Sequence, residues 1–133
     1  MAYSEINYET EFGTVSGYIS NLYSDRNLLN YLEDLFPSKE EVSDIIEMIK
    51  KETANGDFTI LKNIKVDEDF RKQGHGSELM TVFIDESVGP IICVADAHQE
   101  QIEDFSLHSF YVGFGFEKTN YLSNVGYLYI LKN

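Results

Sequence analysis

The 133-residue sequence predicts an α/β fold, in which a central sheet is flanked by helices within a single domain, residues 1–133. Two observations lead to this prediction. An apolar run at residues 60–66 passes through a turn with Gly74 and Gly76 into a helical pattern, which is typical of a strand–turn–helix unit. Strand-like and helix-like runs then alternate to the end of the chain. With 43% hydrophobic residues, a chain of this length can bury a core without metals or disulfides.

The first quarter of the chain predicts one or two strands. Residues 4–11 alternate polar and apolar side chains, as a half-buried strand does. Gly13 and Thr14 are expected to turn the chain into a second run at residues 15–20. The apolar spacing of that run fits a strand or a helix.

Two helices are expected next. Ser24 or Asp25 can cap a helix that carries an apolar side, and Pro37 ends it. Ser38 and Glu41 then form a capping-box pattern that opens a second amphipathic helix, which is expected to close at Asn55 and Gly56. The apolar positions of the two helices are Leu28, Leu29, Leu32, Leu35 and Phe36, then Val42, Ile45, Ile46 and Ile49.

The rest of the chain alternates between the two kinds of element. It predicts a strand at 58–66, a helix at 76–87, a strand at 91–97, a helix at about 103–114, and strands at 116–122 and 127–132. Asn124, Val125 and Gly126 are expected to join the last two strands in a hairpin.

The glycine-bearing turn has the properties of an anion site. It directs backbone N–H groups and the positive end of a helix dipole at one point, which suits a phosphate or pyrophosphate. Gly74 and Gly76 lack the side chains that would obstruct a ligand. No lysine follows Gly76, which excludes a nucleoside-triphosphate loop. Leu79 stands where a dinucleotide fingerprint needs its third small residue.

The wider pattern resembles the acyl-CoA-binding motif of the GNAT superfamily of N-acetyltransferases. Arg71-x-x-Gly74-x-Gly76 follows a strand and a short acidic turn, as Gln/Arg-x-x-Gly-x-Gly/Ala does in that family. The resemblance covers residues 58–132 and implies a GNAT-like mixed sheet flanked by helices. The N-terminal half is atypical of the family, because two strands and then two helices precede the central strand.

A second segment carries the same resemblance. Tyr111-x-x-x-Gly115-Phe116 resembles the family's Tyr-x-x-x-Gly-Phe segment, where a helix ends and a strand begins. Gly115 fits the positive φ that ends many helices. In the family, this tyrosine protonates the CoA thiolate, so the resemblance implies that role for Tyr111. The alternative is that Tyr111 only packs among Phe110, Phe114 and Phe116.

The resemblance implies acetyl-CoA as cosubstrate and a primary amine as acceptor, on a basic small molecule or a protein lysine. In the family, backbone of the central strand pairs with the pantetheine arm, and N–H groups of the turn bind the pyrophosphate. Carried onto this chain, the cofactor-binding residues are Asn63, Ile64, Lys65, Val66, Arg71, Lys72, Gln73, Gly74, His75, Gly76 and Ser77.

A general base is sought after the next strand. The central strand carries no carboxylate before Asp67, whereas the following strand ends at Asp96, with His98 close behind. Asp96 and His98 are therefore the candidate bases. No metal is expected, because the spacing of histidines and carboxylates matches no recognised ligand pattern. Cys93 lies mid-strand and is expected to be a buried, small apolar residue.

Composition bears on compartment and partners. The single cysteine excludes an internal disulfide, and neither a signal peptide nor a membrane span is expected, so the prediction is a cytoplasmic monomer or homodimer. The net charge of −13 argues against nucleic-acid binding and favours a cationic partner. Four of the ten basic residues nevertheless lie in the proposed CoA-binding segment: Lys62, Lys65, Arg71 and Lys72.

Two alternatives to the enzyme stay open. The first is a non-catalytic, acidic GNAT-like protein that binds or inhibits a basic, nucleic-acid-binding partner. The second is an ordinary α/β domain in which the glycine turn is a coincidence.

Overall fold

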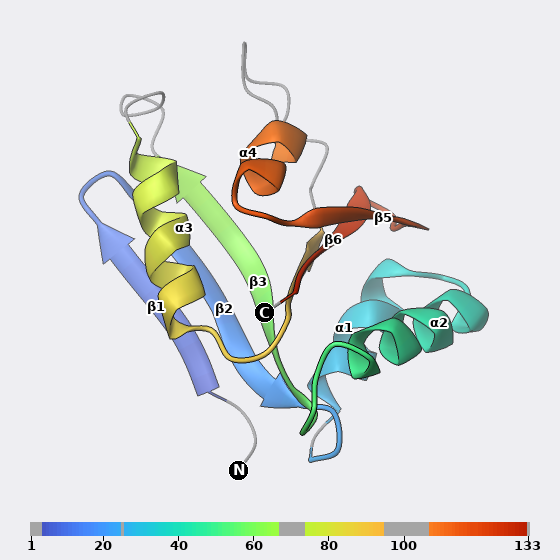
Figure 1. Cartoon of the computed structure of the whole chain (residues 1–133). Coiled ribbons are helices and arrows are strands. Elements are labelled where there is room, and N and C mark those ends of the chain that lie inside the picture. Colours follow the sequence, from blue (N-terminus) through green and yellow to red (C-terminus); the bar gives the residue numbers. More distant parts are fainter. Residues whose placement is uncertain (1–3, 25, 67–73, 95–106, 133) are drawn as a thin grey trace.

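The computed structural model describes residues 4–24, 26–66, 74–94 and 107–132, which form one six-stranded mixed sheet with four helices (Figure 1). In chain order the elements are β1 (Ser4–Thr10), β2 (Gly13–Asn21), α1 (Asn27–Leu35), α2 (Lys39–Lys50), β3 (Asp57–Val66), α3 (His75–Glu86), β4 (Ile91–Val94), α4 (Leu107–Gly113), β5 (Glu117–Leu122) and β6 (Tyr127–Leu131). The strand order is β1-β2-β3-β4-β6-β5. Only the β3–β4 pair is parallel among these described strands, which confirms the predicted mixed α/β fold.

The N-terminal run that fitted either a strand or a helix is a strand. β2 pairs with β1 on one edge and with β3 on the other, and Val15 and Tyr18 are buried. The turn lies at Glu11 and Phe12 and not at Gly13 and Thr14, so that prediction was wrong. Gly13 begins β2, where a Cβ atom would overlap the Lys65 carbonyl oxygen of β3. The glycine therefore serves close strand approach, not the turn.

The two helices after β2 form with one correction at their start. The N-cap of α1 is Arg26 and not Ser24 or Asp25. The Ser24 hydroxyl instead donates to Asn21 Oδ1 at 3.2 Å, and Asp25 lies outside the described residues. The predicted cap of α2 is confirmed, because Ser38 Oγ accepts a hydrogen bond from the Glu41 N–H at 3.4 Å.

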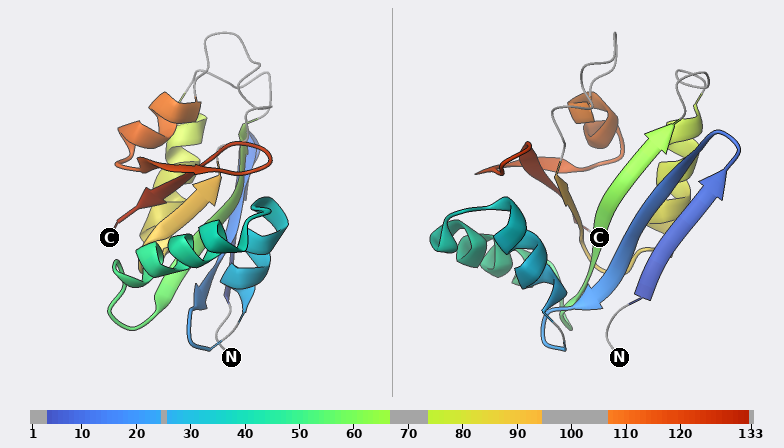
Figure 2. Two further views of the ribbon diagram at one scale, coloured as in Figure 1. Left: turned by 90° about the vertical axis from the view of Figure 1, so that its right-hand side faces the viewer. Right: turned by 180° about the vertical axis from the view of Figure 1, so that it is seen from behind.

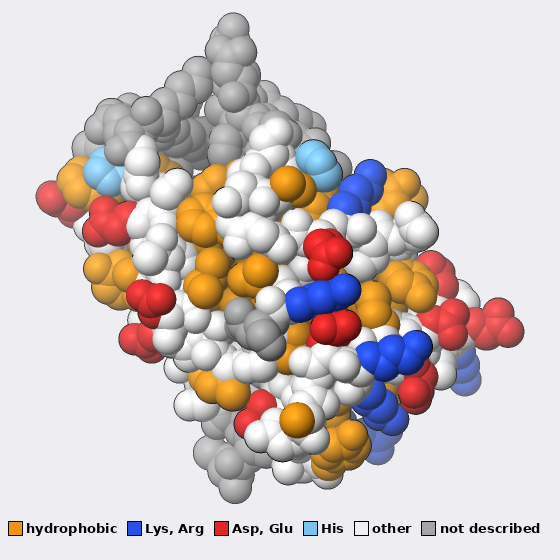
Figure 3. Space-filling view, viewed as in Figure 1, with side chains coloured by type: hydrophobic (Ala, Val, Ile, Leu, Met, Phe, Trp, Pro, Cys, Tyr) orange, Lys and Arg blue, Asp and Glu red, His pale blue; other side chains and the backbone are white. Residues whose placement is uncertain are grey.

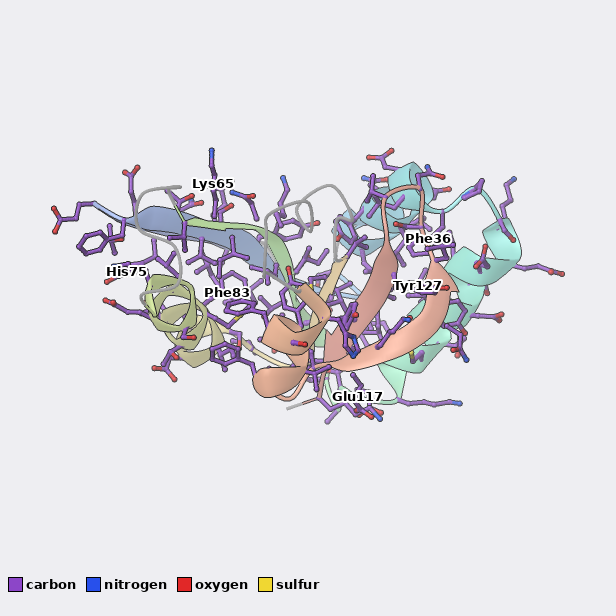
Figure 4. All side chains as sticks on the ribbon, turned by 90° about the horizontal axis from the view of Figure 1, so that it is seen from above. Phe36, Lys65, His75, Phe83, Glu117 and Tyr127 are labelled. Atoms are coloured by element: carbon purple, nitrogen blue, oxygen red, sulfur yellow. The ribbon has the colours of Figure 1, made fainter. Side chains whose placement is uncertain are left out.

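The sheet has a buried core on each face. One core packs α3 and α4 against the sheet through side chains such as Leu79, Phe83 and Tyr111. The other packs α1 and α2 through side chains such as Leu32 and Phe36. Figure 4 labels Phe83 and Phe36 in these two cores. Each face is therefore covered by one pair of helices.

The C-terminal half matches its pattern where it is described. Gly115 has φ +98° and follows α4, as expected of a helix-ending glycine. The predicted hairpin is confirmed, since Leu122 pairs with Tyr127. The hairpin of β5 and β6 runs across the direction of β1–β3 (Figure 2). Of the predicted strand at 91–97 and helix at 103–114, residues 95–97 and 103–106 lie outside the described residues.

In the parts of the chain that the structure describes, no helix is long and apolar enough to cross a membrane.

Candidate functional site

The sheet opens between its two parallel strands. β4 pairs with β3 at Thr59 and Ile60, and in the described part of the chain the pairing stops there. On its other edge, β3 has an irregularity in its register with β2. Ser16 pairs with Asn63 whereas Gly17 pairs with Leu61, so Lys62 is an extra residue. A bulge of this kind bends a strand and increases its twist, and this one lies next to the point where the described pairing of β3 and β4 stops.

Gly17 lets the chain form this opening. A Cβ atom at Gly17 would overlap the Ile60 carbonyl oxygen and would lie 2.7 Å from Cζ of Phe83. Ile60 is the last residue of β3 that pairs with β4, and Phe83 fills the core beneath α3. The glycine therefore allows β2, β3 and α3 to meet at the point where the sheet divides.

A pocket of about 230 Å³ lies at the opening. Its walls come from both sides of the sheet and from elements far apart in the sequence. The lining residues are Tyr31 and Leu35 of α1, Leu61, Lys62 and Asn63 of β3, Val94 of β4, Tyr111 of α4, and Val125 of the β5–β6 turn. The pocket thus combines apolar walls with two phenols, an amide and an ammonium group.

Tyr111 reaches the pocket from α4. Its side chain is 4% exposed and packs against the rings of Phe116 and Tyr129, with centroids 5.4 and 5.5 Å away. Its hydroxyl and the Cys93 thiol form a hydrogen bond. Burial, with a smaller effect of Cys93, raises the pKa of Tyr111 well above its ordinary value. The phenol therefore keeps its proton at pH 7.

Cys93 is buried mid-strand, as predicted. Burial raises the pKa of its thiol, and the hydrogen bond with Tyr111 only partly opposes that effect. A thiol kept protonated in this way is a poor nucleophile.

The glycine turn leads into α3 as expected. Gly74 is the N-cap of α3 with φ +85°, and its carbonyl accepts the first helical hydrogen bond, from the Glu78 N–H at 3.1 Å. Among the residues that the structure describes, none would lie within 4 Å of a Cβ atom at Gly74. The N–H groups of His75, Gly76 and Ser77 belong to the first helical turn, which has no intrahelical acceptor for them.

The two glycines of the turn differ in their surroundings. A Cβ atom at Gly76 would lie 3.4 Å from Phe110 and 3.6 Å from Val66, which is ordinary van der Waals contact. The His75 ring stacks on Phe12 of the β1–β2 turn, with centroids 3.8 Å apart. Gly76 thus faces the protein, whereas Gly74 has no described side chain or backbone close to the position of a Cβ atom.

The predicted site residues fall into three groups. Asn63 and Tyr111 line the same pocket. Ile64, Lys65 and Val66 continue β3, and Gly74, His75, Gly76 and Ser77 form the start of α3. Figure 4 shows the Lys65 side chain pointing to the side of the sheet opposite α3. Arg71, Lys72, Gln73, Asp96 and His98 lie outside the described residues.

The sequence did not predict the wall of the pocket that α1 and the β5–β6 turn form. Tyr31, Leu35 and Val125 were not among the candidates, although all three line it. Leu28, Tyr31 and Leu35 follow one another at helical spacing, so the pattern allowed Tyr31 to be placed on the buried side of α1. Within the described parts of the chain, no three histidine, cysteine, aspartate or glutamate side chains are grouped to hold a metal.

Comparison with known proteins bears on the fold. No protein-family model matches the sequence, and no curated protein matches it. Among solved structures, it is similar to NAA60 of Arabidopsis thaliana in complex with a bisubstrate analogue, with a TM-score of 0.54 and 18% identity. The match covers 92% of this chain and 66% of that chain. This chain therefore has a GNAT-like α/β fold, and it spans about two thirds of the length of its structural neighbour.

Proposed function

We propose that this protein is an acyl-CoA-dependent N-acetyltransferase that moves an acetyl group from acetyl-CoA to a primary amine. The observation that carries the proposal is the pocket at the divergence of β3 and β4, with the neutral phenol of Tyr111 in its wall. The fold is shared with a protein solved with a bisubstrate analogue, which supports a site for two substrates here.

Acetyl-CoA is proposed to lie along β3 and across the start of α3. Beyond Ile60, β3 leaves β4, so the backbone of residues 63–66 is the proposed partner of the pantetheine arm. The N–H groups of His75, Gly76 and Ser77, together with residues 71–73, are proposed to bind the pyrophosphate at the positive end of α3. Lys62 and Lys65 are exposed on β3 and favour the approach of an anion.

The reaction is a direct transfer within a ternary complex. The amine nitrogen attacks the thioester carbon, a C–N bond forms, and the C–S bond breaks. Tyr111 donates its proton to the departing thiolate and is reprotonated from solvent. The proton lost by the amine passes to a base, for which Asp96 and His98 are the proposed candidates because they follow β4 in the sequence. The products are an N-acetyl amide and CoA.

The charge of the described surface favours an amine acceptor. On the face in Figure 3, the acidic side chains on the left have no basic neighbours among the described residues, whereas acidic and basic side chains are interspersed on the right. The exposed acids of α3 are Glu78, Asp85 and Glu86. Such a surface attracts a cationic acceptor, either a basic small molecule or a protein lysine.

Calorimetric titration with acetyl-CoA, CoA and ATP tests the cosubstrate. We expect micromolar binding of acetyl-CoA and CoA, and no binding of ATP. Tyr111→Phe should keep that affinity and lower the turnover of any accepted amine by about a hundredfold or more. Tyr23→Phe is the control, because Tyr23 is 71% exposed and is not among the residues that line the pocket. A protein that binds no acetyl-CoA, or a Tyr111→Phe variant of full activity, would refute the proposal.

The second candidate function is binding without catalysis. It is favoured by the net charge of −13 and by the exposed Glu5, Glu9 and Glu11 along the outermost strand β1 and its turn. Such an edge suits a basic partner protein. Salt-sensitive binding of poly-L-lysine that survives Tyr111→Phe, in a protein that does not bind acetyl-CoA, would favour this function over the transferase.

A further inference from the structure

We propose that the Tyr31 hydroxyl binds the amine acceptor and orients its nitrogen toward the thioester. This inference rests on the proposed transferase function and adds to it a residue that neither the glycine motif nor the Tyr111 segment includes.

Tyr31 and Tyr111 approach the pocket from opposite faces of the sheet. Tyr31 belongs to the core beneath α1 and α2, and Tyr111 to the core beneath α3 and α4. Both nevertheless line the same pocket, because the sheet is open there. The two phenols also meet the same strand. Tyr111 hydrogen-bonds the Cys93 side chain, and Tyr31 hydrogen-bonds the Val94 backbone.

Tyr31 lies in α1, and the C-terminal end of this helix is held by a hydrogen bond. α1 ends against the β5–β6 turn, where the Asn124 N–H donates to the Leu35 carbonyl oxygen at 3.0 Å. That turn is itself held by the Ser123 hydroxyl, which donates to the Gly126 carbonyl oxygen at 2.6 Å. A group held on a helix in this way keeps its place better than one on an unsupported loop.

The hydroxyl of Tyr31 can form more than one hydrogen bond. The Val94 hydrogen bond favours the ionised form, which identifies the backbone N–H as the donor and the phenol oxygen as the acceptor. A phenol has one donor and two acceptor positions, so the bond with Val94 occupies only one of the three. An amine N–H donated to that oxygen fixes the direction of the nitrogen lone pair.

Tyr31 keeps its proton throughout. Burial is the largest influence on its pKa, and Cys93 and Tyr18 add to it, so the pKa lies well above the ordinary value of a tyrosine. The group is therefore a neutral hydrogen-bonding partner and not the general base. Its task is distinct from that of Tyr111, which gives up a proton to sulfur.

The apolar residues that line the pocket with Tyr31 indicate which chemical class of amine the acceptor belongs to. Leu35, Val94 and Val125 line the same pocket as Tyr31 and offer apolar contacts. A chain of methylene groups next to the reacting nitrogen matches these contacts, as in a lysine side chain or an alkylamine. A second ammonium close to the first, as in a short polyamine, would lie against apolar groups at a cost.

The experiment uses two CoA analogues and needs no knowledge of the natural acceptor. In one, the CoA sulfur is joined through a –CH2–C(=O)– unit to butylamine, so the amide N–H stands for the acceptor nitrogen. In the other, N-methylbutylamine replaces butylamine and removes that N–H. Calorimetry measures both analogues and free CoA on wild type, Tyr31→Phe and Tyr129→Phe.

Wild type should bind the N–H analogue about three- to tenfold tighter than the N-methyl analogue, as one neutral hydrogen bond provides. Tyr31→Phe should bind both analogues alike and bind CoA as wild type does. Tyr129→Phe is the matched control: it loses a hydroxyl bonded to His108 Nδ1 at 2.6 Å, outside the pocket lining, and should still discriminate.

Two outcomes would overturn the inference alone. One is a wild-type protein that binds CoA but does not discriminate between the analogues, and this result does not depend on the stability of any variant. The other is a Tyr31→Phe variant that discriminates as wild type does. A wild-type protein that binds neither CoA nor the analogues would instead refute the proposed transferase, and this inference with it.

Discussion

Replacing Gly17 with alanine tests how the opening between β3 and β4 is built. The added methyl group would overlap the Ile60 carbonyl oxygen and lie 2.7 Å from Cζ and 2.8 Å from Cε2 of Phe83. Phe83 is fully buried and Ile60 belongs to the central strand, so relief requires movement of a packed ring and of backbone. Overpacking of this kind costs about 1–3 kcal/mol, and we expect the upper end because backbone is involved.

Gly76→Ala is the matched control for Gly17→Ala. Its methyl group would lie 3.4 Å from Phe110, an ordinary contact, and alanine is favoured over glycine within a helix by up to about 1 kcal/mol. Urea unfolding of both variants measures the difference. We expect Gly17→Ala to lose about 3 kcal/mol of unfolding free energy and Gly76→Ala to lose none. A Gly17→Ala variant as stable as wild type would refute the close-approach argument.

Gly74→Asn should weaken acetyl-CoA binding about tenfold in calorimetry with little loss of fold, because asparagine tolerates φ +85° and its side chain would project from the proposed phosphate-binding turn; unchanged affinity would contradict the phosphate role. The rate of amine acetylation should rise from pH 7 to pH 9 as the amine loses its proton, and Tyr111 should cause no decline there because burial raises its pKa; a flat profile would show that amine deprotonation does not limit the rate. The unfolding free energy should be constant from pH 7 to 8 and fall at higher pH. Burial raises the folded-state pKa of Tyr31, Cys93 and Tyr111, whereas the unfolded chain releases these protons near pH 9 for the thiol and pH 10 for the phenols. The urea midpoint at pH 10.5 should therefore be lower than at pH 7, and Tyr111→Phe should reduce that drop.

Local signals in the sequence predicted local structure well. Ser38 caps α2 and Gly115 follows α4 with positive φ because each depends on a few neighbouring residues. Gly13 shows the opposite case. Its position suggested a turn, but the reason for the glycine is β3, more than fifty residues away in the sequence, which no local pattern contains.

The sequence predicted some of the residues that line the pocket and not others. Asn63 and Tyr111 belong to segments whose resemblance to a family indicated a site, and they do line one pocket. Tyr31 and Val125 come from α1 and from the β5–β6 turn, and they reach the pocket through tertiary packing. They line the pocket because the sheet is open at this point, which no local pattern shows. The only signal in the sequence was the helical spacing of Tyr31, which placed it on the buried side of α1.

The atypical placement of the two helices explains how this opposite wall arises. β2 and β3 are antiparallel neighbours that pair from Asn21–Asp57 to Gly13–Val66, so the chain between them can be extended without disturbing the sheet. The Asn21 side chain closes the ends of this connection by donating to Asp57 Oδ1 at 2.8 Å and to the Asn55 carbonyl oxygen at 3.0 Å. The inserted helices then pack beneath β3, β4 and β6 and bring Tyr31 to the opening. The proposed CoA-binding edge of β3 and the proposed acceptor wall thus come from separate segments, so substitutions at Gly74 and at Tyr31 should affect one substrate each.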